Sequence, residues 1–385
     1  MKATPTDPAV ERELVALAHA FAEREMRPVA AAYDESEAFP WAVFHAACEV
    51  GLASTDIPEE YGGAGIKSLL TACLINEELT WGDSGIASVI SGNGFFAGPI
   101  LALGTEEQKR RWIPPLTRPD SPAAGLALTE PGAGSDAAAI VTHATRVDDG
   151  YVLNGSKTWI SNAPDADRYV VYATVQPGSR SKGITTFVVQ AGDEGFALGK
   201  KIPKLGTRCC PSGELFFTDC FLPEDRRIGD EGQGFHGVLE WFDRSRVLLA
   251  AGSCGVGRAA LEHAVAYAKE RVAFGKPIHE FQAVSFRLVD AKLKLDQARL
   301  LTHHAASLAD AGEPYTTESA MAKVAASEAA WFAAWAAVQT FGGYGYSREY
   351  PVEKLLRDAK LDEIWEGTSD IQRLIVARAM FRHEG

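Results

Sequence analysis

The chain has 385 residues, enough for two or three domains and a large buried core. Its 51 acidic residues outnumber its 38 basic residues, and the formal net charge of −13 argues against a nucleic-acid partner. Six cysteines form no C-x-x-C pair, and the amino-terminal residues lack the apolar core of a signal peptide. The apolar run at 329–338 is far shorter than the roughly 20 residues of a membrane-spanning helix. We therefore expect a cytoplasmic protein with no membrane span.

The first part of the chain, residues 1–122, is predicted to be a helical domain. Apolar residues recur at intervals of three and four, as in Leu14, Leu17, Ala18 and Phe21. Four prolines between residues 114 and 122 then interrupt the pattern, which indicates a domain boundary.

Residues 123–231 change to a period of two and are rich in β-branched and aromatic residues, as in "RYVVYATV" and "ITTFVVQ". No segment of helix length separates these strands. The pattern therefore predicts an antiparallel sheet, a barrel or a sandwich, rather than β-α-β units.

Residues 232–385 return to helical periodicity in long stretches at 237–273, 279–311 and 316–340, followed by two short helices that flank Glu366. Long helices with short connections indicate a bundle. The whole chain is thus predicted to be an α+β multidomain protein in the order helical, β, helical.

Two glycine motifs imitate the dinucleotide-binding fingerprint: "GAGSDA" at 132–137 and "GVGRAA" at 255–260. Neither lies between a strand and a helix, so a nicotinamide-binding Rossmann site is disfavoured. The first motif still offers Thr129, Ser135 and open backbone N–H groups to a ligand, while an ordinary loop is an equal alternative.

Three further segments have both a ligand and a structural interpretation. Trp159 and Ser161 are expected to share one face of a strand, although a tryptophan is more often core. Arg271 and Phe274 are expected one helical turn apart at a helix end. Arg271 would either contact a phosphate beside the stacking ring of Phe274 or simply be a solvated arginine at the helix end. The Gly342–Gly343 loop could admit a phosphate or simply stop a helix.

Trp331 and Trp335 lie four residues apart and are predicted to pack in the core of the bundle. The nine histidines show no H-E-x-x-H spacing, and no Ser-His-Asp arrangement can be read from the chain. Metal-dependent and hydrolytic functions therefore have little support.

The segment "LDEIWEGTSDIQR" contains the strongest catalytic candidate. Ser369 and Gln372 are predicted to form a capping box at the start of the last helix, with Asp370 in its first turn. Glu366 then lies on the preceding turn, next to Trp365. A carboxylate against an apolar ring has a raised pKa, which suits a general base at neutral pH.

Several segments together resemble the acyl-CoA dehydrogenase family, and its medium-chain branch most closely. They are "LTEPGAGSD", "LNGSKTWISNA", "ERVAFGKPI", "QTFGGYGY", "EYPVEKLLRDAK" and "WEGTSDIQRLIVAR", in the family's order and spacing. The resemblance implies a helical N-terminal domain, a middle β domain and a C-terminal four-helix bundle. It also implies FAD as cofactor and a homotetramer built as a dimer of dimers.

The resemblance assigns two groups of residues to FAD. Those near the flavin ring and ribityl chain are Leu126, Leu128, Thr129, Gly134, Ser135, Trp159, Ile160 and Ser161. Those near the adenosine diphosphate of a flavin held by the neighbouring subunit are Arg271, Ala273, Phe274, Phe281, Gln282, Gln339, Gly342, Gly343, Thr368 and Asp370.

For the acyl-CoA, the resemblance assigns Glu366 as the base that removes the α proton while the β hydrogen leaves as hydride to flavin N5. It implies that electrons pass to an electron-transferring flavoprotein and that a short- to medium-chain acyl-CoA becomes a trans-2-enoyl-CoA. Residues expected along the substrate are Ser135, Asp243, Arg246, Gly367, Trp365, Ala87 and Ser91.

The chain departs from the family pattern at Trp365, Phe281 and Ser91. Trp365 and Ser91 lie along the expected acyl pocket, so they bear on substrate choice. Two alternatives keep the fold: an enoyl-CoA reductase or an enzyme acting on acyl-carrier-protein thioesters, and a non-catalytic flavin-binding subunit.

Overall fold

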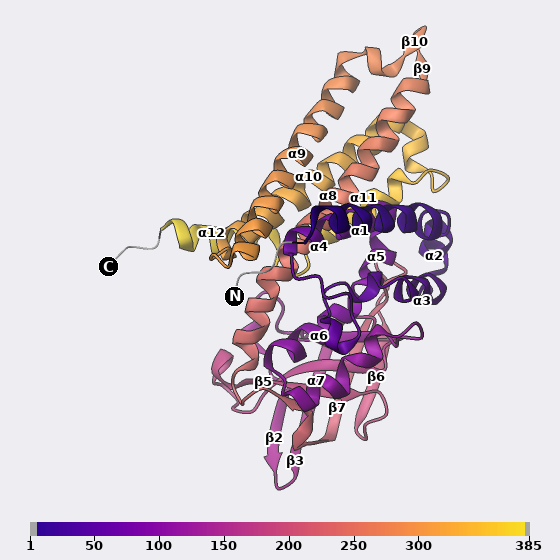
Figure 1. Cartoon of the computed structure of the whole chain (residues 1–385). Coiled ribbons are helices and arrows are strands. Elements are labelled where there is room, and N and C mark those ends of the chain that lie inside the picture. Colours follow the sequence, from indigo (N-terminus) through magenta and orange to yellow (C-terminus); the bar gives the residue numbers. More distant parts are fainter. Residues whose placement is uncertain (1–5, 382–385) are drawn as a thin grey trace.

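The structure is a computed structural model that describes residues 6–381. Figure 1 shows the helices of the N-terminal part between the β-sheet and the long C-terminal helices. One hydrophobic core runs through all three parts and includes Phe44, Tyr151, Ala260 and Ala337. The predicted order of helical, β and helical parts is confirmed.

The N-terminal part is helical because capping residues define its segments. The Asp7 side chain accepts a hydrogen bond from the N–H of Ala9, and Pro8 occupies the first helical position. Thr105 and Gln108 form a capping box further along. The helices are α1 (Pro8–Phe21), α2 (Ala30–Ser36), α3 (Trp41–Glu49), α4 (Leu69–Gly82), α5 (Ser84–Ile90), α6 (Gly92–Leu103) and α7 (Glu106–Trp112).

An apolar stretch longer than 329–338 lies at Ser84–Leu103, and the sequence analysis missed it. Its 20 residues have a mean hydropathy of 1.6, so by length and composition alone they could cross a membrane. In the fold they form α5 and α6, which meet at Ser91, and 56% of the stretch is buried inside the protein. Helix α6 packs against strand β1 (Ala124–Ala127) and the first long bundle helix. Packing within the fold therefore accounts for the apolar character of this stretch.

The middle part is an eight-stranded sheet in the order β6-β7-β3-β2-β4-β5-β8, with β1 paired to β4. Most pairs are antiparallel, as predicted, but β1 runs parallel to β4, and β2 and β4 share a parallel contact at His143 and Thr174. No crossover helix is required because the chain returns through the β2–β3 hairpin. The remaining strands are β2 (His143–Val147), β3 (Gly150–Ser161), β4 (Arg168–Thr174), β5 (Ile184–Gln190), β6 (Phe196–Lys201), β7 (Ser212–Pro223) and β8 (Arg227–Ile228).

The C-terminal part is a bundle of long helices. Its first helix ends at Glu270, three residues before the predicted end, because the chain turns into a short hairpin there. The elements are α8 (Gly234–Glu270), β9 (Val272–Ala273), β10 (Lys276–Pro277), α9 (Gln282–Ala311), α10 (Thr316–Phe341), α11 (Val352–Asp362) and α12 (Ser369–Met380).

The second glycine motif lies inside helix α8 and serves close helix packing. A Cβ added to Gly255 would lie 2.3 Å from the carbonyl oxygen of Glu77 in α4. A Cβ added to Gly257 would lie 3.1 Å from the Cα of Ala330 in α10. The two glycines let both neighbouring helices approach α8, which explains the motif without a nucleotide.

The prediction that Trp331 and Trp335 both lie in the core is wrong for one of them. Trp331 is partly buried against the main core, whereas the Trp335 side chain is 40% exposed. A spacing of four residues places both on one side of α10, but it does not say how far the neighbouring helices cover that side.

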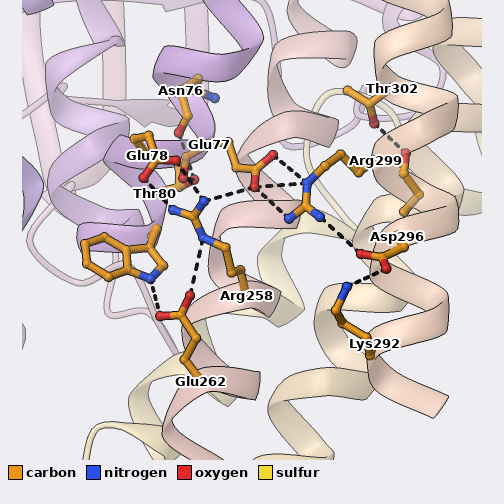
Figure 2. Close-up of polar contacts among 12 residues, drawn as sticks. Asn76, Glu77, Glu78, Thr80, Arg258, Glu262, Lys292, Asp296, Arg299 and Thr302 are labelled. Carbon is orange, nitrogen blue, oxygen red and sulfur yellow. Dashed lines mark hydrogen bonds and ion pairs between the residues drawn. The ribbon is translucent and has the colours of Figure 1, made fainter. Parts of the chain in front are cut away.

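A network of charged side chains joins the N-terminal helices to the bundle (Figure 2). Glu77 of α4 is only 5% exposed and accepts hydrogen bonds from Arg299 of α9, the shortest at 2.7 Å. Arg258 of α8 donates to Glu77 at 3.4 Å and to Glu78 at 2.6 Å. Figure 2 shows Arg258 between the two glutamates and Glu262. Removing a buried carboxylate that is held by two arginines is costly because each arginine would lose one of its counter-charges.

We expect Glu77→Gln to lower the free energy of unfolding by about 3–5 kcal/mol, the usual loss when one member of a buried ion pair is removed. Thermal unfolding of the purified chain would measure the change. Arg348→Ala is the matched control, because its pair with Glu35 is exposed on both sides, and it should change stability by less than about 1 kcal/mol. Equal effects of the two variants would contradict a special role for Glu77.

Candidate active site

Glu366 lies on the turn between α11 and α12, with a backbone φ of 51°, and Gly367 follows with a φ of 91°. The predicted capping box of Ser369 and Gln372 is wrong by one residue. Thr368 is the N-cap, and its hydroxyl accepts a hydrogen bond from the N–H of Ile371. Threonine and serine are both favoured at the N-cap, serine somewhat more so, and the pattern therefore pointed to Ser369 instead of its neighbour Thr368. Asp370 does lie in the first turn, as predicted.

The carboxylate of Glu366 faces helix α8. The hydroxyl of Ser245 donates to Glu366 Oε2 at 2.5 Å. Burial raises the pKa of Glu366 above its ordinary value, although Ser245, Arg246 and Lys323 each lower it. The predicted direction of the shift is therefore confirmed, and its cause is burial within the surrounding helices. Ser245 was missed because 121 residues separate it from Glu366.

Arg246 follows Ser245 on α8 and is buried behind the turn. Its Nε donates to the backbone carbonyl of Glu366 at 3.2 Å, and its Nη1 donates to Asp243 at 2.8 Å. Asp243 also accepts a hydrogen bond from the Thr316 hydroxyl at 2.5 Å. Both of these hydrogen bonds join Arg246 to its own chain, which places it behind the catalytic candidate.

The two small residues expected at the acyl pocket occupy different environments. Ala87 is 1% exposed in α5, whereas Ser91 is exposed where α5 and α6 meet. The Ser91 hydroxyl donates to the carbonyl of Ala87 at 2.9 Å. Trp365 is partly exposed on the turn before Glu366.

The first glycine motif forms a turn with an open backbone. A Cβ added to Gly132 or Gly134 would meet no atom within 4 Å. The hydroxyls of Thr129 and Ser135 have no hydrogen-bond partner within residues 6–381. Leu126 is half-buried and Leu128 buried on the strand side of the turn. Unused donors beside open backbone suit a polar cofactor.

Trp159 lies on a β-bulge of β3, where the register with β7 shifts between Lys157 and Ile160. Its φ is 61°, and its side chain is 57% exposed, while Ile160 is buried. The bulge interrupts the alternation before Ile160. From Trp159 to Ser161 the residues are exposed, buried and half-buried in turn, which agrees with the predicted shared face of Trp159 and Ser161. The bulge presents a large flat ring to the outside of the sheet.

A buried ion pair beneath this surface was missed by the sequence analysis. Lys157 Nζ lies 2.7 Å from Glu130 Oε1, and both side chains are almost fully buried. Burial raises the pKa of Glu130, but Lys157 and the N–H groups of Val141 and Thr142 outweigh it, so the pKa falls below its ordinary value. The pair ties the loop after β1 to β3 and thereby fixes the glycine turn beside Trp159.

Arg271 and Phe274 are not one helical turn apart, as the sequence analysis expected. Helix α8 ends before Arg271, and Phe274 and Gly275 form the two-residue turn of the β9–β10 hairpin, with φ values of 51° and 83°. Positive φ at both central residues is typical of a type I′ hairpin turn. Phe274 is 97% exposed at this tip, and Ala273 precedes it in β9.

A cleft of about 460 Å³ lies at the base of this hairpin. Arg271 lines it together with Gly342, Gly343 and Tyr344, and a Cβ on either glycine would meet no atom within 4 Å. Arg271 has no ion-pair partner within the described part of the chain. An unpaired arginine next to open backbone suits a phosphate. Phe281 and Gln282 begin α9 nearby, and Gln339 is exposed near the end of α10.

The structure does not bring all of these residues together within one chain. Figure 1 places the β9–β10 hairpin at the far tip of the bundle, at the opposite end of the molecule from the sheet that carries Trp159. The start of α12, with Thr368 and Asp370, is away from that tip. The groups fit the two ends of FAD, a flat ring and a pyrophosphate, but they fit them at separate places.

Comparison with known proteins identifies the family. Three family models match consecutive parts of the chain: the acyl-CoA dehydrogenase N-terminal domain over residues 8–120, the middle domain over 125–220 and the C-terminal domain over 232–381. The human mitochondrial short-chain specific acyl-CoA dehydrogenase is 42% identical over 97% of this chain and 91% of its own length.

Solved structures agree with this result. Butyryl-CoA dehydrogenase from Megasphaera elsdenii superimposes with a TM-score of 0.93 at 38% identity, over 99% of this chain and 100% of the other. A chain in a structure described as "Electron transferring flavoprotein of Acidaminococcus fermentans" gives 0.94 at 38% identity and covers both chains completely. These relatives carry short-chain or butyryl names where the sequence analysis placed the medium-chain branch nearest. The chain belongs to the acyl-CoA dehydrogenase family of FAD-dependent oxidoreductases.

Proposed function

We propose that this protein dehydrogenates short, straight acyl-CoA thioesters between the α and β carbons, with Glu366 as the base. The observation that carries the proposal is the Glu366 turn, where a carboxylate with a raised pKa follows a partly exposed aromatic ring. The relatives named for short-chain substrates support the choice of acyl group. Bound FAD would accept the β hydrogen as hydride.

Glu366 offers two groups to a thioester. Ser245 occupies Oε2, while Oε1 has no hydrogen-bond partner within residues 6–381, so Oε1 can take the α proton. The backbone N–H of Glu366 also has no acceptor among the described residues. A free N–H on the same residue can polarise the thioester carbonyl, which makes the α hydrogen more acidic.

We infer that three aromatic residues limit the space near the proposed base. Trp241 lies one helical turn before Ser245 on α8, so both side chains share a face of that helix. Its ring packs edge-on against Phe95 of α6, with 4.6 Å between centroids. We infer that this pair and Trp365 wall the acyl pocket, and that Ala87 and Ser91 lie at its far end. Walls of this kind favour a straight acyl chain over a branched one, because an added methyl group would overpack the pocket.

We propose that Arg271, Gly342 and Gly343 bind the pyrophosphate of a FAD whose ring lies on the partner subunit. The separation of the two groups of cofactor residues in Figure 1 supports this arrangement. An exposed apolar face on α9 supports assembly, because Phe286, Val289 and Leu293 recur at helical spacing and are each more than 50% exposed. The oligomer proposed is a homotetramer, a dimer of dimers.

The proposed electron acceptor is an electron-transferring flavoprotein. The structural likeness to a chain in the Acidaminococcus fermentans flavoprotein structure supports this partner. A cytoplasmic location stays a prediction.

We expect Glu366→Gln to keep its FAD and to bind acyl-CoA, while turnover falls by at least about 10²-fold, since losses of a general base are of that order. Steady-state assays with butyryl-CoA and an artificial acceptor would measure it. Glu363→Gln, on the same turn, is the matched control and should stay within a few-fold of wild type. Turnover of the Glu366 variant within tenfold of wild type would rule out this base.

We expect Arg271→Glu to lose FAD and to shift the protein toward smaller species, because reversing a charge beside a phosphate replaces attraction by repulsion. The flavin-to-protein ratio and sedimentation velocity would report both effects. Arg111→Glu reverses an exposed arginine of the N-terminal part as a control. A fully loaded Arg271 variant of wild-type size would show that this arginine is only a solvated residue.

We expect butyryl-CoA and hexanoyl-CoA to exceed isobutyryl-CoA and 2-methylbutyryl-CoA in kcat/KM by about 10–200-fold, the range that one misplaced methyl group produces in a pocket. Trp365 and Trp241 leave little room for a branch at the α carbon. A side-by-side panel of straight chains from four to ten carbons and branched chains would test this. Highest kcat/KM with a branched thioester would overturn the pocket assignment but not the family.

A further inference from the structure

The turn that carries Glu366 is held from behind by three side chains of three helices. Arg246 of α8 donates to the Glu366 carbonyl at 3.2 Å. Gln372 of α12 donates to the same carbonyl at 3.3 Å and to the Gly367 carbonyl at 3.0 Å. Lys323 of α10 donates to the Gly367 carbonyl at 3.0 Å. Two consecutive carbonyls of the turn are thus held by side chains of three helices.

Lys323 is unusual among these three side chains. Lys323 is fully buried. In the described part of the chain, no carboxylate lies within ion-pair distance of its ammonium. Its ammonium instead donates a hydrogen bond to the neutral backbone carbonyl of Gly367. Burying an ammonium without a counter-ion costs free energy that a methionine of similar length would not cost. Fold stability alone does not account for a lysine here.

The charged groups that act on Lys323 come from α8, from α11 and from the turn that carries Glu366. Asp362 of α11, Glu363 and Glu366 of the turn, and Arg246 of α8 all act on it through space. Burial lowers the pKa of Lys323 to about 8, although Asp362 and Glu366 raise it. Burial also raises the pKa of Asp362 to about 7, against a hydrogen bond from Ser253 and the charge of Lys323. Lys323 therefore remains a cation near pH 7.

We propose that Lys323 is a positioning residue for the reaction: it holds the Gly367 carbonyl, and its charge keeps the neighbouring Glu366 carboxylate ionised and ready to accept the α proton. This inference rests on Glu366 being the base. It assigns Lys323 a role in proton removal, without contact to substrate or cofactor.

The sign of the effect follows from the charges. Burial raises the pKa of Glu366, and the cations Lys323 and Arg246 counteract it. Without Lys323 the pKa of Glu366 rises further. Because only the ionised carboxylate accepts a proton, the acid limb of the pH profile moves to higher pH.

The test follows proton removal separately from hydride transfer. FAD-loaded protein is mixed in D₂O with a short acyl-CoA that has sulfur in place of its β carbon, which has α hydrogens but no β hydrogen to lose. Mass spectrometry measures deuterium uptake at the α carbon across pH 5–9. In Lys323→Met we expect the acid limb of the exchange profile to lie about one pH unit higher than in the wild type. At low pH, exchange should then be about tenfold slower. Lys323→Arg should keep the wild-type limb.

Two controls separate the possible failures. Lys360→Met removes a partly exposed cation from α11 and should leave the limb in place. Glu366→Gln should abolish exchange, and exchange that persists would overturn the base assignment itself, whatever Lys323 does.

An unchanged acid limb in flavin-loaded Lys323→Met would overturn the positioning role while leaving the base intact. Lys323→Gln keeps a hydrogen-bond donor without the charge and is expected to shift the limb in the same way. Loss of flavin in both uncharged variants would assign Lys323 to the fold and would equally overturn the inference.

Discussion

Helix α8 sets the geometry on which the rest of the structure depends. It carries Ser245 and Arg246 against the Glu366 turn, and it ends at the hairpin that begins with Arg271. At 1.5 Å per residue, the segment from Ser245 to Arg271 is about 39 Å long. A rigid helix of that length holds the proposed base and the proposed phosphate site apart within one chain, which is the reason for proposing that this phosphate site binds a flavin whose ring lies on another subunit.

The rigidity of α8 comes from its contacts along nearly its whole length. Gly255 and Gly257 let α4 and α10 lie against it, and Arg258 joins it to the buried carboxylate of Glu77. These contacts fix the N-terminal helices to the bundle through close packing that excludes water and through buried ion pairs. The walls of the proposed acyl pocket, from α6 and α8, are thereby held in a constant relation to the turn that carries Glu366.

The sequence predicted features that depend on neighbouring residues in the chain. Periodicity identified the long helices and the strands, and the Glu366 turn followed from the helix patterns on either side. Features that depend on a single dihedral angle or on distant partners were missed. The bulge at Trp159 and the hairpin turn at Phe274 each require a positive φ at a non-glycine residue, which no pattern indicates. The roles of Lys157 and Lys323 could not be predicted because their hydrogen-bond partners lie 27 and 44 residues away in the sequence.

The positive φ of Glu366 is itself informative about the site. A non-glycine residue in this region costs of order 1–3 kcal/mol, and it persists only where its surroundings enforce it. Here the enforcing contacts are the hydrogen bonds to the carbonyls of Glu366 and Gly367. A glycine at position 366 would relieve the strain but would have no carboxylate. In this conformation the Glu366 N–H and one carboxylate oxygen have no partners in residues 6–381, and these are the two groups that the proposed reaction would use on the thioester carbonyl and the α hydrogen. Backbone strain, burial of the carboxylate and an unpaired N–H therefore coincide at Glu366, as expected if this one residue both polarises the carbonyl and removes the α proton.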